Sequence, residues 1–79
     1  VYLLKSISPG KRKTYVGYTN NLTKRLFLHN NNKGAKSTRG FKWKILYKKK
    51  FVSKSKAMSY EYKLKHNKIL RKKIITKYD

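Results

Sequence analysis

The sequence predicts a small α+β domain, in which a three-stranded antiparallel sheet is flanked by helices in the order β-β-α-β-α-α. Three observations predict this fold. Two short apolar and aromatic segments flank a proline–glycine turn, a later segment alternates aromatic residues with lysines, and two segments repeat apolar residues at helical spacing. With 79 residues, no internal repeat and no long linker, residues 1–79 are expected to form a single domain around one core.

The first two strands are expected to form a hairpin. Residues 1–8, VYLLKSIS, are largely apolar and end where Pro9 and Gly10 favour a turn. Residues 13–18, KTYVGY, are rich in aromatic and β-branched residues, which favours a second strand. Gly17 stands inside that strand, where a glycine weakens the pairing unless another backbone or a ligand approaches closely.

The middle of the chain predicts a helix, a polar loop and a third strand. Residues 19–32 change to helical spacing, with Thr19 or Asn20 as the expected N-cap. Residues 33–40 follow as a loop that contains two glycines. Residues 41–48 then alternate large apolar residues with lysines, which predicts a strand with one buried face. The expected residues of that face are Phe41, Trp43, Ile45 and Tyr47.

The last third of the chain is expected to be helical. Residues 53–67 return to helical spacing, and Ser53 or Ser55 is a suitable N-cap. Residues 68–79 predict either a further short helix or a basic tail.

The composition indicates a polyanionic partner. The chain carries 23 Lys and Arg against 2 Asp and Glu, a formal net charge of +21, and such a field attracts nucleic acid. An anionic membrane surface or nonspecific adhesion is the weaker alternative. No apolar run reaches the ~20 residues that a membrane span needs. The absence of Cys excludes disulfides and thiolate metal sites. No signal peptide is visible, so an intracellular location at nucleic acid is expected, and Val1 in place of Met indicates a trimmed N-terminus.

Glu61 is the one internal acidic residue, since the other, Asp79, ends the sequence. Its helical spacing from Ala57, Met58 and Leu64 places it on or beside the apolar face of the predicted helix. A carboxylate there is costly to bury unless an ion pair or a metal compensates it. An i,i+4 pair with Lys65 is the structural explanation, although such a pair contributes only ~0.3–0.5 kcal/mol. Metal binding is the functional explanation.

Arg25 and His29 form a second group of interest, because their i,i+4 spacing places both on one helix face. An arginine fork beside an imidazole suits a phosphate, while a solvated basic face is the simpler explanation. On the strands, Tyr2 and Tyr15 are candidate proton acceptors, since nearby cations should lower the pKa of a phenol. Ordinary burial in the sheet explains the same tyrosines.

Together these residues resemble the GIY-YIG endonuclease family. VYLL followed by KTYVGYTNNLTKRLFLHN is similar to the opening of that domain, with Val1-Tyr2 at the end of the first triplet and Tyr15-Val16-Gly17 as the second. KGAKSTRGFKWKILYKKKF resembles the loop and strand of the Slx1-like and UPF0213 branch, and SKAMSYEYKLK resembles its glutamate-bearing helix. The similar segments follow one another over essentially the whole chain.

The resemblance implies a metal-dependent endonuclease that hydrolyses DNA phosphodiester bonds. Glu61 would hold one divalent ion, Mg²⁺ or Mn²⁺, with waters in the remaining positions. Arg25 would stabilise charge on the scissile phosphate. Tyr2 or Tyr15 would orient or deprotonate the attacking water, with His29 assisting. The resemblance further implies a role in DNA repair or recombination.

The resemblance also implies how the substrate is held. Gly17 would let the substrate or the neighbouring strand come close. Phosphate contacts position a substrate without reading its sequence, so branched, flapped or nicked DNA is expected, with RNA as an alternative. A protein partner that supplies substrate targeting is a further expectation. The basic residues expected to contact nucleic acid are Lys33, Lys36, Arg39, Lys42, Lys44 and Lys65.

Two other functions fit the same charge. One is a noncatalytic nucleic-acid-binding module that keeps this fold as a scaffold. The other is a small basic ribosome-associated protein, which would prefer structured RNA over DNA.

Overall fold

The predicted order of elements is confirmed by a computed structural model, which describes residues 1–10 and 12–78. Lys11, in the predicted hairpin turn, and Asp79, at the end of the predicted tail, lie outside the described residues. The elements are β1 (Tyr2–Ser6), β2 (Thr14–Gly17), α1 (Leu22–Asn30), a 3₁₀ helix η1 (Lys36–Thr38), β3 (Trp43–Lys48), α2 (Lys54–His66) and α3 (Lys68–Tyr78).

The sheet is antiparallel, with strand order β2-β1-β3, so β1 is the central strand and β2 lies at an edge. Tyr2 lies opposite Gly17 on one side and opposite Lys48 on the other. The pairing of β1 with β3 continues past the strand end, where the Lys49 N–H donates to the Val1 carbonyl at 2.9 Å. The start of β1 is therefore held on both sides at the position of Tyr2.

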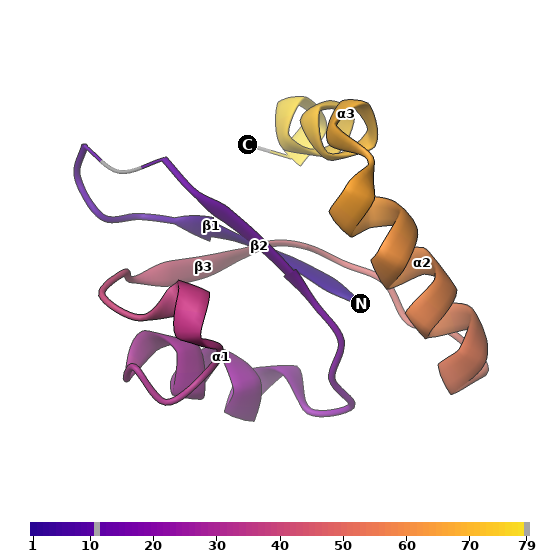
Figure 1. Ribbon diagram of the computed structural model, residues 1–79, viewed down its shortest axis with the longest axis horizontal. Coiled ribbons are helices and arrows are strands. Elements are labelled where there is room, and N and C mark those ends of the chain that lie inside the picture. Colours follow the sequence, from indigo (N-terminus) through magenta and orange to yellow (C-terminus); the bar gives the residue numbers. More distant parts are fainter. Residues whose placement is uncertain (11, 79) are drawn as a thin grey trace.

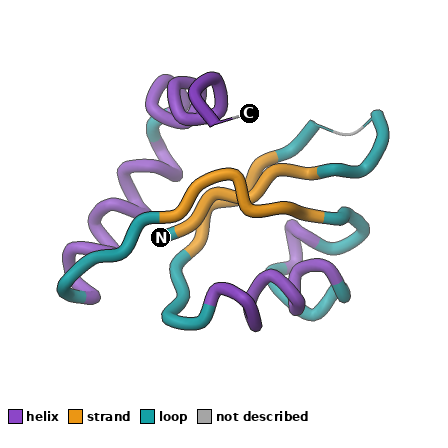
Figure 2. Tube along the Cα trace, turned by 180° about the vertical axis from the view of Figure 1, so that it is seen from behind, coloured by secondary structure: helices purple, strands orange, loops and turns teal. Residues whose placement is uncertain are grey.

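Helices cover both faces of the sheet: α1 lies on one face, and α2 and α3 lie on the other (Figures 1 and 2). Side chains of β1 alternate between the two layers. Val1 and Leu3 join a core with residues of α2 and α3, whereas Tyr2 and Leu4 pack toward α1 together with Trp43. The apolar run at the start of the chain is continuous because both of its faces are buried.

The helix caps match the sequence expectation at α2 and differ from it at α1. The Ser53 side chain accepts a hydrogen bond from the Lys56 N–H at 3.2 Å and caps α2 as expected. At α1 the cap is Asn21, neither Thr19 nor Asn20, and its side chain accepts from the Lys24 N–H. The Thr19 hydroxyl oxygen instead accepts from the Asn21 N–H, so it shapes the turn before the helix.

The expected single buried face of β3 is wrong, because the strand contains a bulge. Tyr47 lies opposite Leu3 and Ile45 lies opposite Leu4, which leaves Leu46 as an extra residue. An extra residue reverses the alternation of side chains. Tyr47 and Leu46 therefore both pack toward α2 and α3, and Ile45 is 37% exposed.

None of the helices within residues 1–10 and 12–78 has both the length and the apolar character needed to cross a bilayer.

Candidate active site

The centre of the candidate site is a hydrogen bond between Tyr2 and His29. The Tyr2 hydroxyl oxygen lies 2.9 Å from His29 Nε2, and the bond is buried. Tyr2 reaches this place because it is on the α1 face of the central strand. His29 reaches it from the last turn of α1, where its side chain is fully buried.

The second ring nitrogen of His29 is also occupied. Its Nδ1 lies 2.9 Å from the Thr38 hydroxyl oxygen, and that hydroxyl donates to the Ala35 carbonyl at 2.7 Å. A Cβ on Gly34 would lie 3.0 Å from His29 Cε1, so only a glycine leaves room for the ring there. Neither Thr38 nor Gly34 was predicted as a site residue. Spacing carries no signal for them, because the loop folds back on α1 through tertiary contacts. The signal that could have indicated them is the resemblance of KGAKSTRG, which contains both residues, to the loop of the family.

Arg25 lies one helical turn before His29 and interacts with both site tyrosines, Tyr2 and Tyr15. The Tyr2 hydroxyl, close enough to hydrogen-bond the guanidinium, raises the pKa of Arg25 against the opposing effect of burial, and Tyr15 adds to this rise. The Nε of Arg25 is buried and has no partner among the described residues. An unpaired buried donor of this kind is expected where a ligand completes the hydrogen bonding.

The expectation that the pKa of the tyrosines falls is wrong for Tyr2. Burial of Tyr2, which is 2% exposed, raises the pKa of its hydroxyl, and the opposing effect of Arg25 is smaller. For His29, burial lowers the pKa of the ring, and the positive charge of Arg25 lowers it further. Both shifts favour the neutral form, so the pair rests as a phenol and a neutral imidazole.

Tyr15 and Gly17 stand on the edge strand beside this pair. The Tyr15 ring centroid lies 4.9 Å from that of His29 and 6.3 Å from that of Tyr2. Gly17 lies directly across from Tyr2, and an added Cβ would come within 2.5 Å of Tyr2 Cζ. The close neighbour of Gly17 is therefore the tyrosine of the adjacent strand.

Glu61 approaches from α2, and its side chain is 17% exposed. The Lys65 ammonium lies 4.0 Å from its carboxylate, at the outer limit of an ion pair. The charge of Glu61 contributes to the raised pKa of Tyr2, after burial and the nearer groups. Glu61 thus acts on the same hydroxyl as Arg25 and His29.

The donor set suits a hard cation held mainly by water and substrate. Within residues 1–10 and 12–78 no three His, Asp or Glu side chains come together as a metal cluster. Mg²⁺ is commonly held by one or two carboxylates together with waters and substrate phosphates. One weakly paired carboxylate, Glu61, whose charge reaches Tyr2, fits that mode of binding.

The predicted nucleic-acid contacts surround the site unevenly. All six of these basic residues are exposed. Lys65 is next to Glu61, and Lys36 belongs to η1, the segment that contains Thr38. Lys44 lies opposite Lys5, at the far end of β1 from Tyr2.

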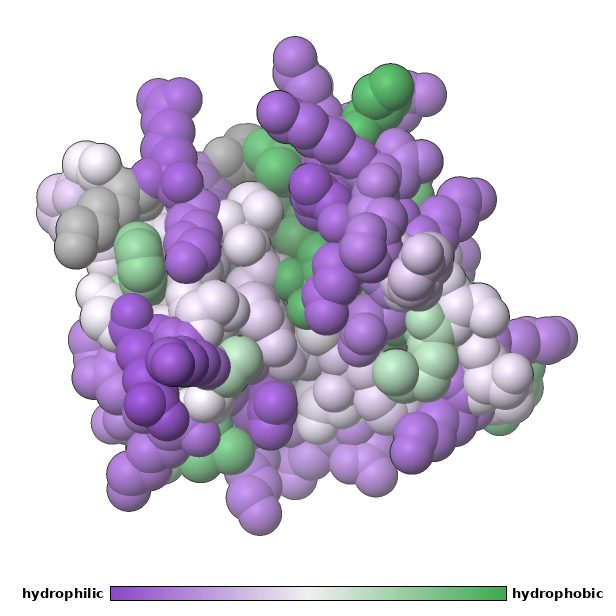
Figure 3. All heavy atoms as spheres, viewed as in Figure 1, coloured by the Kyte–Doolittle hydropathy of each residue, from purple (hydrophilic) through white to green (hydrophobic). Residues whose placement is uncertain are grey.

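In Figure 3, hydrophilic side chains surround a paler central area of the face on which β2 crosses in front of β1.

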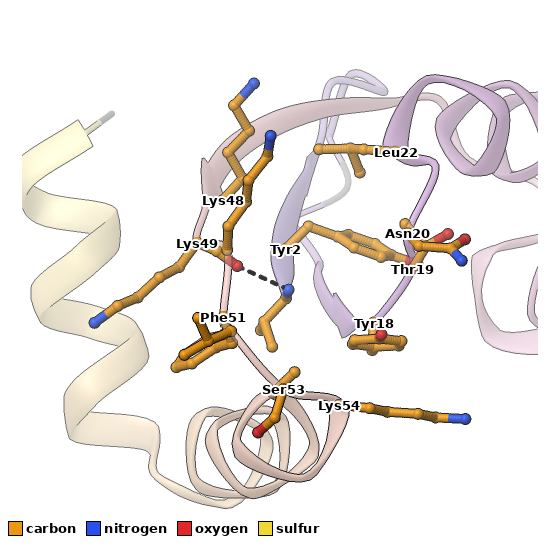
Figure 4. A pocket seen from close by; sticks show the side chains of 14 residues that line it. Tyr2, Tyr18, Thr19, Asn20, Leu22, Lys48, Lys49, Phe51, Ser53 and Lys54 are labelled. Carbon is orange, nitrogen blue, oxygen red and sulfur yellow. Dashed lines mark hydrogen bonds between the residues drawn. The ribbon is translucent and has the colours of Figure 1, made fainter.

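A pocket of about 430 Å³ opens beside Tyr2. Tyr18 and Phe51 lie on opposite sides of it, and lysines from β3, the β3–α2 connection and the start of α2 extend around it (Figure 4). These lysines are Lys48, Lys49, Lys50 and Lys54. None of the four is among the six basic residues singled out from the sequence, because a run of lysines in a lysine-rich chain does not indicate its position in space.

Comparison with known proteins gives a consistent family. The sequence profile described as the GIY-YIG catalytic domain matches residues 1–74. A UPF0213 protein of Oceanobacillus iheyensis is 48% identical over 66 residues, which cover 82% of this chain and 73% of that protein. A UPF0213 protein of Streptococcus pneumoniae is 47% identical over 55 residues, covering 68% of this chain and 56% of that protein. A UPF0213 protein of Clostridium perfringens is 46% identical over 66 residues, covering 82% and 68%.

The chain thus spans little more than half the length of some of these relatives and about three quarters of others. No solved structure matches the chain.

Proposed function

The chain belongs to the GIY-YIG catalytic domain family, and from that premise we propose that it is an endonuclease that hydrolyses DNA phosphodiester bonds with one divalent ion. The family indicates an endonuclease, and the roles of single residues are proposed here for this chain. The observation that carries the proposal is the buried hydrogen bond between Tyr2 and His29, with Arg25 within hydrogen-bonding reach of the same tyrosine hydroxyl and the charge of Glu61 acting on it from α2.

Arg25 is proposed to bind the scissile phosphate. Its Nε has no partner among the described residues, and the nearby tyrosine hydroxyls keep the side chain in the site. A guanidinium can donate two parallel hydrogen bonds to phosphate oxygens, which a lysine cannot. In this low-dielectric place such donors stabilise the charge that develops on the phosphate during attack.

Tyr2 and His29 are proposed to act together as the base. Because burial raises the pKa of Tyr2, a standing phenolate is unfavourable. The Tyr2 oxygen can nevertheless take a proton from water while its own proton passes to His29 Nε2, which lies 2.9 Å away. The water oxygen then attacks phosphorus, the Tyr2 O–H bond is re-formed, and the ring of His29 carries the extra proton.

Glu61 is proposed to hold the divalent ion, Mg²⁺ or Mn²⁺, through its carboxylate. When bound, such an ion neutralises negative charge on the phosphate group being cleaved. Tyr15 is proposed to orient Arg25, and Gly17 leaves the space in which the Tyr2 hydroxyl sits.

The substrate is proposed to be DNA recognised by shape. The net charge of +21 gives strong, sequence-independent attraction to phosphates. Phosphate contacts fix the position of a duplex without reading its bases. Branched, flapped or nicked DNA would thus be preferred over a particular base sequence.

The experiment that tests the proposal compares the wild type with Glu61→Gln on labelled branched and linear DNA, each with Mg²⁺ or with EDTA. Metal-dependent cleavage by the wild type, lost in Glu61→Gln while DNA binding remains, supports the proposal. Lys63→Gln is a matched control, because it changes the charge of a neighbouring exposed residue of α2. Equal binding without cleavage by either protein would instead indicate a noncatalytic module. A preference for structured RNA in competition would indicate an RNA-associated protein.

A further inference from the structure

We propose that Thr38 is a positioning residue, whose hydroxyl fixes the proton of His29 on Nδ1 and keeps Nε2 free to accept from Tyr2. The role in catalysis rests on the proposed function. The position of the proton is a property of the free protein, and it is measured separately.

The direction of each hydrogen bond follows from counting protons. A carbonyl oxygen can only accept, so the bond between Thr38 and the Ala35 carbonyl uses the one hydroxyl proton of Thr38. The Thr38 oxygen can then offer only a lone pair to His29 Nδ1, at 2.9 Å. Nδ1 must therefore carry a proton and donate it. In a neutral imidazole the other nitrogen is then an acceptor, so the Tyr2 hydroxyl donates to Nε2.

The surroundings prevent the threonine hydroxyl from turning away. Thr38 and His29 are both fully buried, so no bulk water competes for their bonds. The Thr38 carbonyl accepts a buried hydrogen bond from Trp43 Nε1 at 3.0 Å, which ties the end of η1 to β3. The absence of a Cβ on Gly34 lets the loop close against the imidazole ring. The loop from Gly34 to Thr38 thus holds one tautomer by fixed contacts.

The other tautomer would disable the proposed relay. With its proton on Nε2, His29 would donate to the Tyr2 oxygen and could take no proton from it. The Tyr2 proton would then have no acceptor when the hydroxyl takes a proton from water. Thr38 touches neither water nor phosphate in this scheme, and it acts through the ring of His29.

The proposal is tested first on the free protein by the ¹⁵N chemical shifts of the histidine ring nitrogens. In the wild type above the pKa of His29 we expect the pattern of a single Nδ1–H tautomer. His66, on the exposed surface of α2, provides the reference within the same molecule. Thr38→Val removes the acceptor with little change of shape and should abolish the single-tautomer pattern, whereas Thr38→Ser should keep it.

The second readout is cleavage of DNA under the conditions in which the wild type cuts. Thr38→Val should lower kcat by about tenfold or more, with KM for DNA little changed, and Thr38→Ser should restore most of it. A wild-type Nε2–H tautomer would overturn the proposal even if no variant folds. A Thr38→Val enzyme that cuts as fast as the wild type would overturn the catalytic role. An inactive wild type with the expected tautomer would instead count against the nuclease function and leave the role of Thr38 in place.

Discussion

The Tyr2 hydroxyl and His29 Nε2 share a buried hydrogen bond of 2.9 Å, although 27 residues separate them in the sequence. The bond joins the central strand to the last turn of α1, so the site depends on the packing of that helix against the sheet. Burial raises the pKa of Tyr2 and lowers that of His29, and a neutral pair is the result. This neutral state has measurable consequences for stability and for activity.

The first prediction is that His29 makes the protein less stable as the pH falls below about 6.5. The pKa of folded His29 lies below the unfolded value of 6.5, so the unfolded chain binds more protons in that range. The free energy of unfolding therefore decreases as the pH falls from about 6.5 toward the lowered pKa of His29 in the folded state. Thermal unfolding at pH values from about 5 to 7.5 measures this slope.

Because the chain has only 2 Asp and Glu, carboxylates contribute little to that slope. His29→Gln should reduce it, even if the substitution lowers the melting temperature overall, and the α-amino group of Val1, whose pKa burial also lowers, should account for part of what remains. His66→Gln, which changes an exposed histidine, is the matched control substitution. An equally steep slope in His29→Gln would contradict the prediction.

The second prediction concerns Gly17. In Gly17→Ala the new Cβ would come within 2.5 Å of Tyr2 Cζ, so the tyrosine ring must move. We expect a loss of about 1–3 kcal/mol in the free energy of unfolding, measured by urea denaturation, together with slower cleavage. In a Tyr2→Leu background, which lacks the ring, the same substitution should cost less. Additive effects of the two changes would show that Gly17 and Tyr2 do not interact.

The candidate site residues that lie on one element, or on paired strands, could be predicted from the sequence. Spacing places Arg25 and His29 on one helix face, and a glycine inside a strand indicates a close approach at Gly17. Thr38 could not be found in this way, because its contact with His29 depends on how the loop folds back. The pKa of Tyr2 was misjudged because net charge is visible in the sequence whereas burial is not, and burial dominates there.

The alternating residue types of β3 gave a wrong prediction of its buried face for a related reason. A bulge changes the face of every residue beyond it, and residue types 41–48 do not indicate where one occurs. The fold class survived this error because β1 and the helices bury both faces of the sheet in any case.

The third prediction compares two arginines. Arg25→Met should reduce cleavage by about 10²–10³-fold, because it removes the proposed phosphate donors. It should cost less stability than the loss of Arg71, since methionine fills similar space and the Nε of Arg25 has no partner among the described residues, although the contacts of its guanidinium with the Tyr2 and Tyr15 hydroxyls are lost. Arg71→Met should show the reverse, because Arg71 donates to the Leu64 and Lys65 carbonyls at the end of α2. Its loss should cost about 1–2 kcal/mol of stability.

Cleavage rates and denaturation curves of the two variants, measured in parallel, check this contrast. Equal losses of activity and stability in both would mean that Arg25 is a structural residue. Such a result would remove the phosphate-binding role from the proposed function.

The last prediction distinguishes local phosphate contacts from diffuse charge. Lys36 is exposed on η1, the segment that also contains Thr38. It is one of the basic residues predicted to contact nucleic acid. Each phosphate contact adds about 0.9 to the slope of log affinity against log salt for duplex DNA. Lys36→Gln should reduce that slope by about one contact and weaken binding at every salt concentration. Lys72→Gln, an equal charge change on an exposed position of α3, should leave the slope nearly unchanged. If both substitutions lowered the slope equally, DNA would bind over the whole surface and not mainly around the candidate site. The shape of the substrate would then have to be recognised by the pocket beside Tyr2 and its lysines.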